Sequence, residues 1–274
     1  MTARILITGA AGGLGTLLRP RLSREDRVLR LLDIAELPAA TEGERVELVQ
    51  ASITDMAAME AACADVDAVI HLGGHSLERP WEQVLDVNIN GTHTVLEAAR
   101  RQGVRRVVLA SSNHAVGYVE KAAGEAGDYL FPKPDTYYGV SKVALEALGS
   151  LYASRYGQDV ICVRIGSCFE KPRDVRMLST WLSPDDGARL MEACLAAPRP
   201  GFRVVWGVSD NTRRWFSLDE AHALGYESKD NSEVHAPEVL AEHGEPSPDS
   251  LAERYLGGLW CGPDFDTAVK ESGK

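Results

Sequence analysis

The sequence RILITGAAGGLG, residues 4–15, decides the expected fold. Its first five residues, 4–8, form a short apolar run that is typical of a buried parallel strand. Glycines follow in the spacing Gly-x-x-Gly-x-x-Gly, and a helical pattern begins at Thr16. A strand, a glycine turn and a helix in this order bring backbone N–H groups close to a pyrophosphate at the positive end of the helix. The stretch therefore predicts a dinucleotide-binding turn, and the alternative is a glycine-rich turn that binds nothing.

Further apolar runs alternate with helical patterns along the chain. Strands are expected at residues 28–32, 45–49, 68–72, 105–109 and 160–165, with long helices at 81–101 and 136–156. Five or six strands that alternate with helices predict an α/β fold, a doubly wound parallel Rossmann sheet with right-handed crossovers. The alternation weakens after Gly166, where we expect a helix ending near Cys194 and a strand at 202–206. We therefore expect an NAD-binding Rossmann domain at 1–165 and a small substrate-binding lobe at 166–274, packed as one compact unit.

Composition and charge argue against several classes of protein. The 274 residues are 45% hydrophobic and 25% charged, and the net charge is −11. No basic stripe is present to neutralise phosphates, so neither nucleic acid nor an anionic membrane is an expected partner. The five cysteines form no Cys-x-x-Cys pair, and no signal peptide or membrane span is recognisable, so we expect a cytoplasmic protein with free thiols. His222, His235 and His243 lack metal-ligand spacing, and no metal site is expected.

Two strand ends carry residues that suit a nucleotide. Asp33 follows the second strand, 18 residues after Gly15, where a carboxylate can accept hydrogen bonds from a ribose and would repel a 2′-phosphate. That position favours NAD over NADP, and the alternative is an exposed loop aspartate. The fourth strand opens into residues 73–76, whose two glycines leave room for a ligand beside the sheet. Ser76 and His75 would face that crevice, although His75 could equally be a surface histidine.

The segment TYYGVSK, residues 136–142, suggests a reaction. It places the phenol of Tyr138 and the ammonium of Lys142 four residues apart, on one face of a helix. A nearby ammonium lowers the pKa of a phenol, which is otherwise about 10, so this tyrosine could accept a proton from an alcohol while a hydride leaves the same carbon. Such pairs also occur by chance in many helices. Polar residues 110–114, at the end of the fifth strand, could bond a substrate oxygen or simply form a turn.

Taken together, these features resemble a known family. They occur in the order glycine turn, Asp33, Ser111-Ser112 and Tyr138-x-x-x-Lys142. This order resembles the extended short-chain dehydrogenase/reductases, also called NAD-dependent epimerase/dehydratases. Four segments further resemble the bacterial uronate dehydrogenases: residues 111–114, 137–142, 164–167 and 176–183. The resemblance implies NAD-dependent oxidation of the C1 hydroxyl of D-glucuronate or D-galacturonate to an aldarolactone, with a small sugar acid as the partner.

The resemblance also implies a role for each matching residue. Tyr138 would be the base, Lys142 would lower its pKa and hold the nicotinamide ribose, and Ser112 would complete the catalytic set. Arg176 would bind the C6 carboxylate. The residues implied for NAD binding are Gly9, Gly12, Gly13, Leu14, Gly15, Asp33, Ile34, Ser52, Ile53, Leu72, Gly73, Gly74, Asn90, Tyr138, Lys142 and Ile165. Those implied for sugar binding are Ser76, Ser112, Asn113, His114, Tyr138, Ser167 and Arg176.

Some details depart from the family or stay open. Ser52 stands where many members carry an aspartate, which puts an adenine contact there in doubt, whereas Ile53 could still pack on the ring. Either Trp260 or Phe265 could line the sugar pocket. Read without the resemblance, Arg176 would form a surface ion pair with a neighbouring acid, Asp174 or Glu170.

Two other functions remain compatible with these motifs. A nucleotide-sugar epimerase or dehydratase shares the fold and the Tyr138/Lys142 pair, but it needs a larger C-terminal lobe than the 108 residues that follow Gly166. A non-catalytic NAD-sensing protein would use the same scaffold without needing a proton acceptor. By fold-level analogy, the exposed faces of the helices at 81–101 and 136–156 could pair in a homo-oligomer.

Overall fold

A parallel sheet organises the molecule. The computed structural model describes residues 2–263 and 265, and within them seven strands form one parallel sheet in the order β3-β2-β1-β4-β5-β6-β9. Sequence analysis expected the parallel sheet but only five or six strands in it. The strands are β1 (Ala3–Thr8), β2 (Arg27–Asp33), β3 (Val46–Gln50), β4 (Ala68–His71), β5 (Arg106–Ser112), β6 (Asp159–Ile165) and β9 (Phe202–Gly207), with a small separate pair β7 (Ser167–Cys168) and β8 (Trp181–Leu182).

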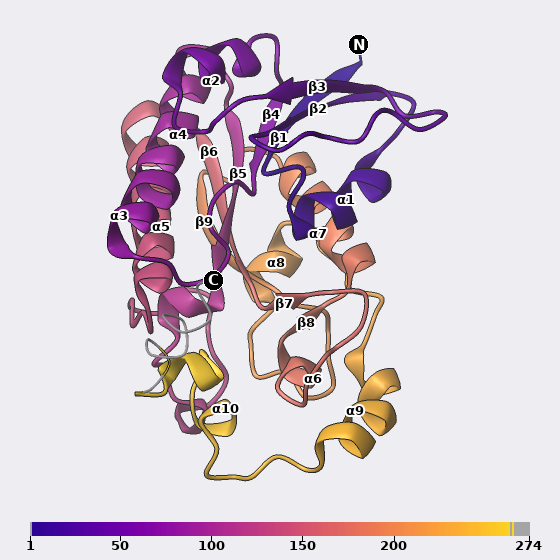
Figure 1. Ribbon diagram of the computed structural model, residues 1–274, viewed down its shortest axis with the longest axis vertical. Helices are drawn as coiled ribbons and strands as arrows, with labels where there is room; N and C mark the ends of the chain where they lie inside the picture. Colours follow the sequence, from indigo (N-terminus) through magenta and orange to yellow (C-terminus); the bar gives the residue numbers. More distant parts are fainter. Residues whose placement is uncertain (1, 264, 266–274) are drawn as a thin grey trace.

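Helices cover both faces of the sheet, as Figure 1 shows. Helices α2, α4 and α5 pack on one face and α1 with α7 on the other, and each face buries its own hydrophobic cluster. The helical elements, with η for 3₁₀ or π turns, are α1 (Gly13–Leu22), α2 (Met56–Cys63), α3 (Trp81–Gln83), η1 (Val84–Asn90), α4 (Gly91–Arg101), η2 (Asn113–Val116), η3 (Lys121–Ala123), α5 (Tyr137–Tyr156), α6 (Met177–Thr180), α7 (Pro184–Ala196), α8 (Asp219–Ala223), η4 (Ser232–His235), α9 (Ala236–His243), α10 (Leu251–Arg254) and η5 (Gly258–Cys261).

The helices that bear on the site begin and end where the sequence indicates. Helix α5 starts after Thr136, whose hydroxyl accepts a hydrogen bond from the N–H of Gly139 at 3.0 Å, and it ends at Gly157, which has a φ of 71°. The single helix expected at 81–101 is instead a run of three parts, because η1 is π-helical. Such π turns alter which side chains face inward, and they occur often at functional sites.

The sheet extends beyond the domain boundary expected at residue 165. The predicted strand at 202–206 exists as β9, and it pairs with β6 as the outermost strand, with Phe202 opposite Val160. Helix α7 also belongs to the sheet's covering layer, since it packs beside α1. What remains outside the layers is the lower part of Figure 1, where β7, β8, α6, α9 and α10 gather beyond the carboxyl ends of the strands.

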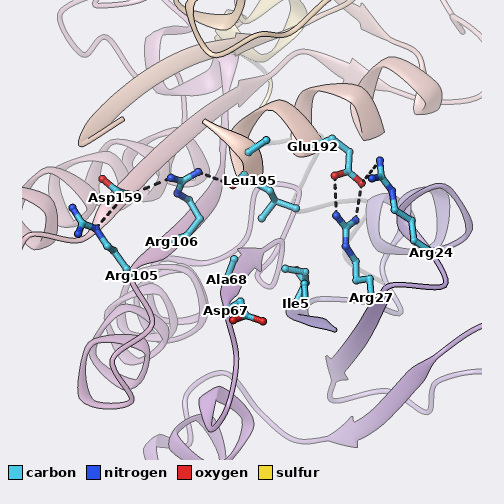
Figure 2. Close-up of a pocket in the computed structure, with 12 residues that line it drawn as sticks. Ile5, Arg24, Arg27, Asp67, Ala68, Arg105, Arg106, Asp159, Glu192 and Leu195 are labelled. Carbon is cyan, nitrogen blue, oxygen red and sulfur yellow. Dashed lines mark hydrogen bonds and ion pairs between the residues drawn. The ribbon is translucent and has the colours of Figure 1, made fainter. Parts of the chain in front are cut away.

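The amino ends of the strands border a cavity of about 430 Å³, shown in Figure 2. Arg27 donates to both carboxylate oxygens of Glu192, at 2.6 and 2.9 Å, and Arg105 donates to Asp159 at 2.9 Å. Arg106 donates to carbonyl oxygens at the end of α7, among them that of Leu195 at 2.9 Å. Each of these guanidinium groups has at least one acceptor, although Nε of Arg27 and Nε of Arg106 are buried without a partner among the described residues. The contacts of Arg27 and Arg106 join α7 to the sheet.

Within the described residues, no helix is both long and apolar enough to cross a membrane. The same residues contain no cluster of three or more histidine, cysteine, aspartate or glutamate side chains that could hold a metal ion.

Candidate active site

The glycine turn lies between β1 and α1, where the strand order reverses. Gly9 has a φ of 71°, and a Cβ on it would lie 2.6 Å from the backbone nitrogen of Gly73, so the turn packs directly on the end of β4. Gly12 has no side chain to cap α1, which leaves the first N–H groups of the helix available. Around Gly13 the described residues leave open space, with nothing within 4 Å of an added Cβ. A pyrophosphate fits this place.

Asp33 joins the end of β2 to the glycine turn. One carboxylate oxygen accepts from the N–H of Ala11 at 2.9 Å, and the other accepts from the N–H of Ala35 at 3.0 Å. A carboxylate oxygen can accept more than one hydrogen bond, so both keep capacity for ribose hydroxyls. The side chain is therefore held in place beside the turn, unlike a free loop aspartate. Ile34, the next residue, is 70% exposed on the same rim.

Ile53 is buried beside the loop that follows β4, and its packing on an adenine ring stays a prediction. It is 6% exposed, and its side chain fills the space beside two glycines: a Cβ on Gly73 would lie 3.1 Å from it, and one on Gly91 would lie 2.7 Å from it. The hydroxyl of Ser52 forms a local hydrogen bond with that of Thr54, at 2.8 Å. Ile53 thus packs against Gly73, in the loop that follows β4, and against Gly91.

An asparagine other than the one expected supports the crevice. Asn90 is exposed at the end of η1, whereas Asn88 is 4% exposed. The side chain of Asn88 accepts from the N–H of His75 at 2.8 Å and donates to the carbonyl of His75 at 3.1 Å and to the hydroxyl of Ser141 at 3.0 Å. The NAD contact expected of Asn90 stays a prediction, and the π-helical geometry of η1 turns Asn88 inward.

The loop after β4 is shaped by these contacts. Gly74 has a φ of 141°, and a Cβ on it would lie 3.1 Å from the Asn88 side chain. Leu72 and Gly73 are half-buried, and Ser76 is exposed. His75 is half-buried, and burial together with the nearby charge of Arg79 lowers its pKa. Asn88 thus fixes His75 through its backbone, and nothing in this loop assigns its imidazole a chemical role.

Glu78 holds the start of the helix that carries Tyr138, and sequence analysis did not find it. Its carboxylate is almost fully buried and accepts from the N–H of Tyr138 at 2.7 Å and from that of Tyr137 at 3.2 Å. The first N–H groups of a helix have no partner within the helix and carry partial positive charge. A buried carboxylate from a distant loop therefore fixes the backbone of Tyr138.

The electrostatics of Tyr138 differ from the expectation. Burial raises the pKa of Tyr138 to about 12, although a hydrogen bond with Ser112 acts in the opposite direction. Lys142 donates from Nζ to the carbonyl of Ala110 at 2.7 Å, and its Nζ lies 5.3 Å from the centre of the Tyr138 ring. The prediction that Lys142 lowers the pKa of Tyr138 is wrong for this structure, because the effect of burial is larger and the ammonium bonds a carbonyl. Burial also lowers the pKa of Lys142, to about 8.

His114 and Trp260 enclose the Tyr138 ring. The centre of the His114 ring lies 3.9 Å from that of Trp260 in a stacked arrangement, and it lies 5.9 Å from that of Tyr138, edge to face. Trp260 also meets Tyr138 edge to face at 5.8 Å, while Phe265 stacks on Trp260 at 4.8 Å. Of the two aromatic candidates left open, Trp260 is therefore the one against Tyr138, and Phe265 backs it.

Arg176 and Asn113 meet at a backbone carbonyl. Asn113 donates from Nδ2 to the carbonyl oxygen of Leu256 at 3.2 Å, and Arg176 donates from Nη2 to the same oxygen. Two further polar atoms, Nε of Arg176 and Oδ1 of Asn113, are buried without a hydrogen-bond partner among the described residues. A buried donor and a buried acceptor left open at one place are costly unless a ligand binds them.

The surface ion pair considered for Arg176 does not form. Asp174 instead accepts from the N–H of Met177 at 2.8 Å, and Glu170 lies 3.5 Å from Arg21. Burial lowers the pKa of Arg176, with Asp174 acting in the opposite direction. The guanidinium nevertheless stays charged at neutral pH. It is thus a desolvated cation whose neighbouring acids are engaged elsewhere.

Ser167 and Ile165 lie where β6 passes into β7. The hydroxyl of Ser167 is buried and lies 3.0 Å from that of Thr180. A Cβ on Gly166 would lie 2.1 Å from the carbonyl oxygen of Thr180, so only glycine fits between Ile165 and Ser167. Ile165 is half-buried at the end of β6. The hydroxyl of Ser167 therefore already has a hydrogen-bond partner, and its sugar contact stays a prediction.

The predicted residues divide into three groups. One surrounds the phenol, with contacts that join Ser112, Asn113, His114, Tyr138, Lys142 and Arg176. A second lines the glycine turn and the ends of β2 and β4, where Leu14 is half-buried at the start of α1 and Gly15 packs so closely on Gly9 and Ala10 that a Cβ would lie 2.6 Å from both carbonyl oxygens. Ser76 and Asn90 form the third group, exposed residues whose expected ligand contacts stay predictions. Glu78, Asn88, Asp135 and Leu256 are the participants that no local motif indicated.

The chain is similar to known proteins over most of its length. Residues 5–201 match the model of the NAD dependent epimerase/dehydratase family. A uronate dehydrogenase of Pseudomonas syringae pv. tomato is 45% identical over 258 residues, which cover 94% of this chain and 92% of that protein.

Two solved structures are similar in fold and sequence. The crystal structure of a glucuronic acid dehydrogenase from Chromohalobacter salexigens has a TM-score of 0.90 and 41% identity, covering 97% of this chain and 99% of that one. A uronate dehydrogenase from Agrobacterium tumefaciens, solved as a tyrosine-to-alanine mutant complexed with NAD, has a TM-score of 0.89 and 40% identity, covering 94% and 97%.

Proposed function

Because the chain belongs to the NAD dependent epimerase/dehydratase family, we propose that it is an NAD-dependent oxidoreductase that oxidises the C1 hydroxyl of a hexuronic acid, D-glucuronate or D-galacturonate, to the aldarolactone. The observation that carries the proposal is the buried guanidinium of Arg176, which bonds the backbone carbonyl of Leu256 but forms no ion pair with a carboxylate of the described residues. A desolvated arginine that lacks a carboxylate suits a substrate that brings one.

Several features fit the cofactor. The free N–H groups at the start of α1 and the open space at Gly13 suit the pyrophosphate, and the carboxylate of Asp33 suits the adenosine ribose. Lys142, with Nζ beside Tyr138, would hold the nicotinamide ribose. NAD, when bound, supplies the acceptor for the hydride that leaves C1.

The residues around the phenol would then orient the sugar and move one proton. Arg176 binds the C6 carboxylate, and the open oxygen of Asn113 accepts from a sugar hydroxyl. As the C1 hydrogen leaves with its electron pair, the phenolate oxygen of Tyr138 takes the hydroxyl proton, and the C1–O bond becomes a carbonyl. Because C1 of the cyclic sugar already carries the ring oxygen, this carbonyl is that of a lactone. The hydroxyl of Ser112, which bonds the phenol, steadies the oxygen during the transfer.

The charge of Arg176 also supplies selectivity. A hydrogen bond to a charged group is worth about 1.5–3 kcal/mol, so a uronate should be preferred to the matching neutral hexose by roughly ten- to a hundredfold. A neutral sugar would leave the guanidinium buried and unpaired, at a similar cost.

The test is the production of NADH, followed at its absorbance, across uronic acids, neutral hexoses and nucleotide-sugars. We expect rapid NADH formation with D-glucuronate or D-galacturonate and a lactone as the first product in NMR spectra of the mixture. Equal rates with a neutral hexose would remove the role of Arg176. Conversion of a nucleotide-sugar without net NADH would establish an epimerase or dehydratase instead, and no turnover with any of them would favour an NAD-sensing protein.

A further inference from the structure

A buried carboxylate stands behind His114. The side chain of Asp135 is 0% exposed, and one of its oxygens lies 2.6 Å from Nδ1 of His114. The surrounding backbone approaches that oxygen very closely, since a Cβ on Gly117 or on Gly257 would lie 2.0 Å from it. Two glycines from distant parts of the chain therefore make a slot that only the carboxylate of Asp135 fills.

The short contact decides which nitrogen of the imidazole carries hydrogen. An ionised carboxylate can only accept a hydrogen bond, so Nδ1 of His114 must be the donor. Burial lowers the pKa of His114, which leaves the ring neutral at neutral pH. A neutral ring with hydrogen on Nδ1 has a lone pair on Nε2, and no described residue is seen to hydrogen-bond that atom.

We propose that Asp135 is a positioning residue that holds His114 as the Nδ1–H tautomer, so that Nε2 accepts a hydrogen bond from a hydroxyl of the sugar. The inference rests on the proposed function for the identity of that donor. Stacking on Trp260 and the edge contact with Tyr138 fix the plane of the ring, and Asp135 fixes its rotation. The expected sugar contact of His114 thereby acquires a direction: the ring accepts, and the substrate must donate.

The same aspartate couples the ring to the helix of Tyr138. Its second oxygen accepts from the hydroxyl of Thr136 at 3.1 Å, and Thr136 is the residue that caps α5. The charged and titratable groups that face His114 are Asp135, Tyr138 and Arg176. The thiol of Cys261 lies behind them, with its sulfur 4.0 Å from an oxygen of Asp135. If the charge of Asp135 is removed, few neighbouring groups can take its place as the hydrogen-bond acceptor for Nδ1 of His114.

The first test reads the tautomer directly, in the protein without substrate. The nitrogen-15 NMR signals of the imidazoles are recorded, and His114 is assigned by their loss in His114→Gln. We expect hydrogen on Nδ1 in the native protein. In Asp135→Asn the amide can donate to Nδ1, so the ring should shift toward the Nε2–H tautomer. Hydrogen on Nε2 in the native protein, or an unchanged tautomer in Asp135→Asn, overturns the proposal.

The second test is kinetic. Asp135→Asn should raise the KM for the uronate about tenfold, the equivalent of one neutral hydrogen bond, with a smaller change in kcat. Asp135→Asn should add no further loss to His114→Gln if it acts through the ring. An additional loss of the same size in the double variant would contradict that route.

Two matched variants separate positioning from stability. Asp128→Asn changes another buried carboxylate, one that accepts from the backbone N–H of Trp206 at 3.3 Å, and it should lower the Tm without altering the tautomer or the KM. Gly117→Ala displaces Asp135 from its slot without changing any charge, and it should reproduce the tautomer shift. A tautomer that shifts as expected in a protein that oxidises no uronate would refute the proposed function and the sugar contact, while the role of Asp135 toward the ring would stand.

Discussion

Buried arginines lie at the amino ends and at the carboxyl ends of the strands, here called the amino edge and the carboxyl edge. They differ in whether a carboxylate of the protein pairs with them. At the amino edge, Arg27 forms a two-point contact with Glu192, and this hydrogen bond raises its pKa (Figure 2). At the carboxyl edge, burial lowers the pKa of Arg176, whose described partner is the carbonyl of Leu256. An arginine that is paired with a carboxylate of the protein has its charge compensated, and removing one partner of the pair destabilises the fold. One that lacks a carboxylate costs stability and keeps its charge for a ligand.

The largest expected effect at the carboxyl edge comes from removing one oxygen. Tyr138→Phe should lower kcat by about 10²–10⁴-fold, the usual contribution of a general base, because the proton of the C1 hydroxyl loses its acceptor. NAD binding, measured by titration calorimetry, and the Tm should stay near their native values, since the ring still packs against His114 and Trp260. A variant that kept most of its NADH production would show that Tyr138 is not the base.

A smaller loss should follow from Arg176→Met. We expect the KM for the uronate to rise roughly ten- to a hundredfold, as one charged hydrogen bond requires, with the Tm unchanged or raised because a buried unpaired charge is gone. The rate with a neutral hexose is the internal control and should change little. A large fall in Tm would mean that Arg176 holds the structure together, as Arg27 does.

Arg27→Met should show the reverse pattern. It leaves the partly exposed Glu192 with Arg24, 3.1 Å away, as its remaining cation, so the free energy of unfolding in urea should fall by about 2 kcal/mol, below the cost for a fully buried pair. The KM for the uronate should not change. The double change with Glu192→Gln should recover part of the lost stability, and a failure to recover any would assign the loss to packing of the arginine stem.

The last expected effect is graded with pH and requires no substitution. Because burial lowers the pKa of Lys142 to about 8, the pair with Tyr138 holds both protons below that pH. Loss of one proton permits the form with phenolate and ammonium, which can accept the substrate proton. For the oxidation, kcat/KM should therefore rise up to about tenfold per pH unit below pH 8 and level off above it. Lys142→Met should remove the levelling-off near pH 8, because the phenol of Tyr138 then titrates alone with its pKa of about 12 and the rise continues above pH 8. Arg27→Met should keep the native profile, and a flat native profile between pH 6 and 8 would contradict this assignment.

Local patterns accounted for much of the fold and for part of the site. The glycine turn, Asp33 and the Tyr138/Lys142 spacing each lie within one or two elements, so their consequences can be read from neighbours in the sequence. The apolar run at 202–206 was likewise recognisable as a strand, but its place beside β6 was not, because pairing between distant strands leaves no local signal.

The remaining site residues act across long stretches of chain. Glu78 reaches Tyr138 across 60 residues, and Leu256 reaches Asn113 across 143. Periodicity also misled at η1, where an ordinary helix was expected and a π turn brought Asn88 inward. The pKa of Tyr138 was expected to fall because its charged neighbour is visible in the sequence, while its burial is not. The sequence likewise shows the acids that neighbour Arg176 but not its burial, and therefore a surface ion pair was considered for it.

The position of β9 bears on how the protein is made. Strand β6 is synthesised roughly forty residues before β9, which is about 2–8 s at 5–20 residues per second. Throughout that interval one long apolar edge of the nascent sheet has no neighbour, and unpaired strand edges attract other chains. A chaperone that shields this edge should therefore raise the yield of correctly folded enzyme, whereas slower translation between β6 and β9 should lower it.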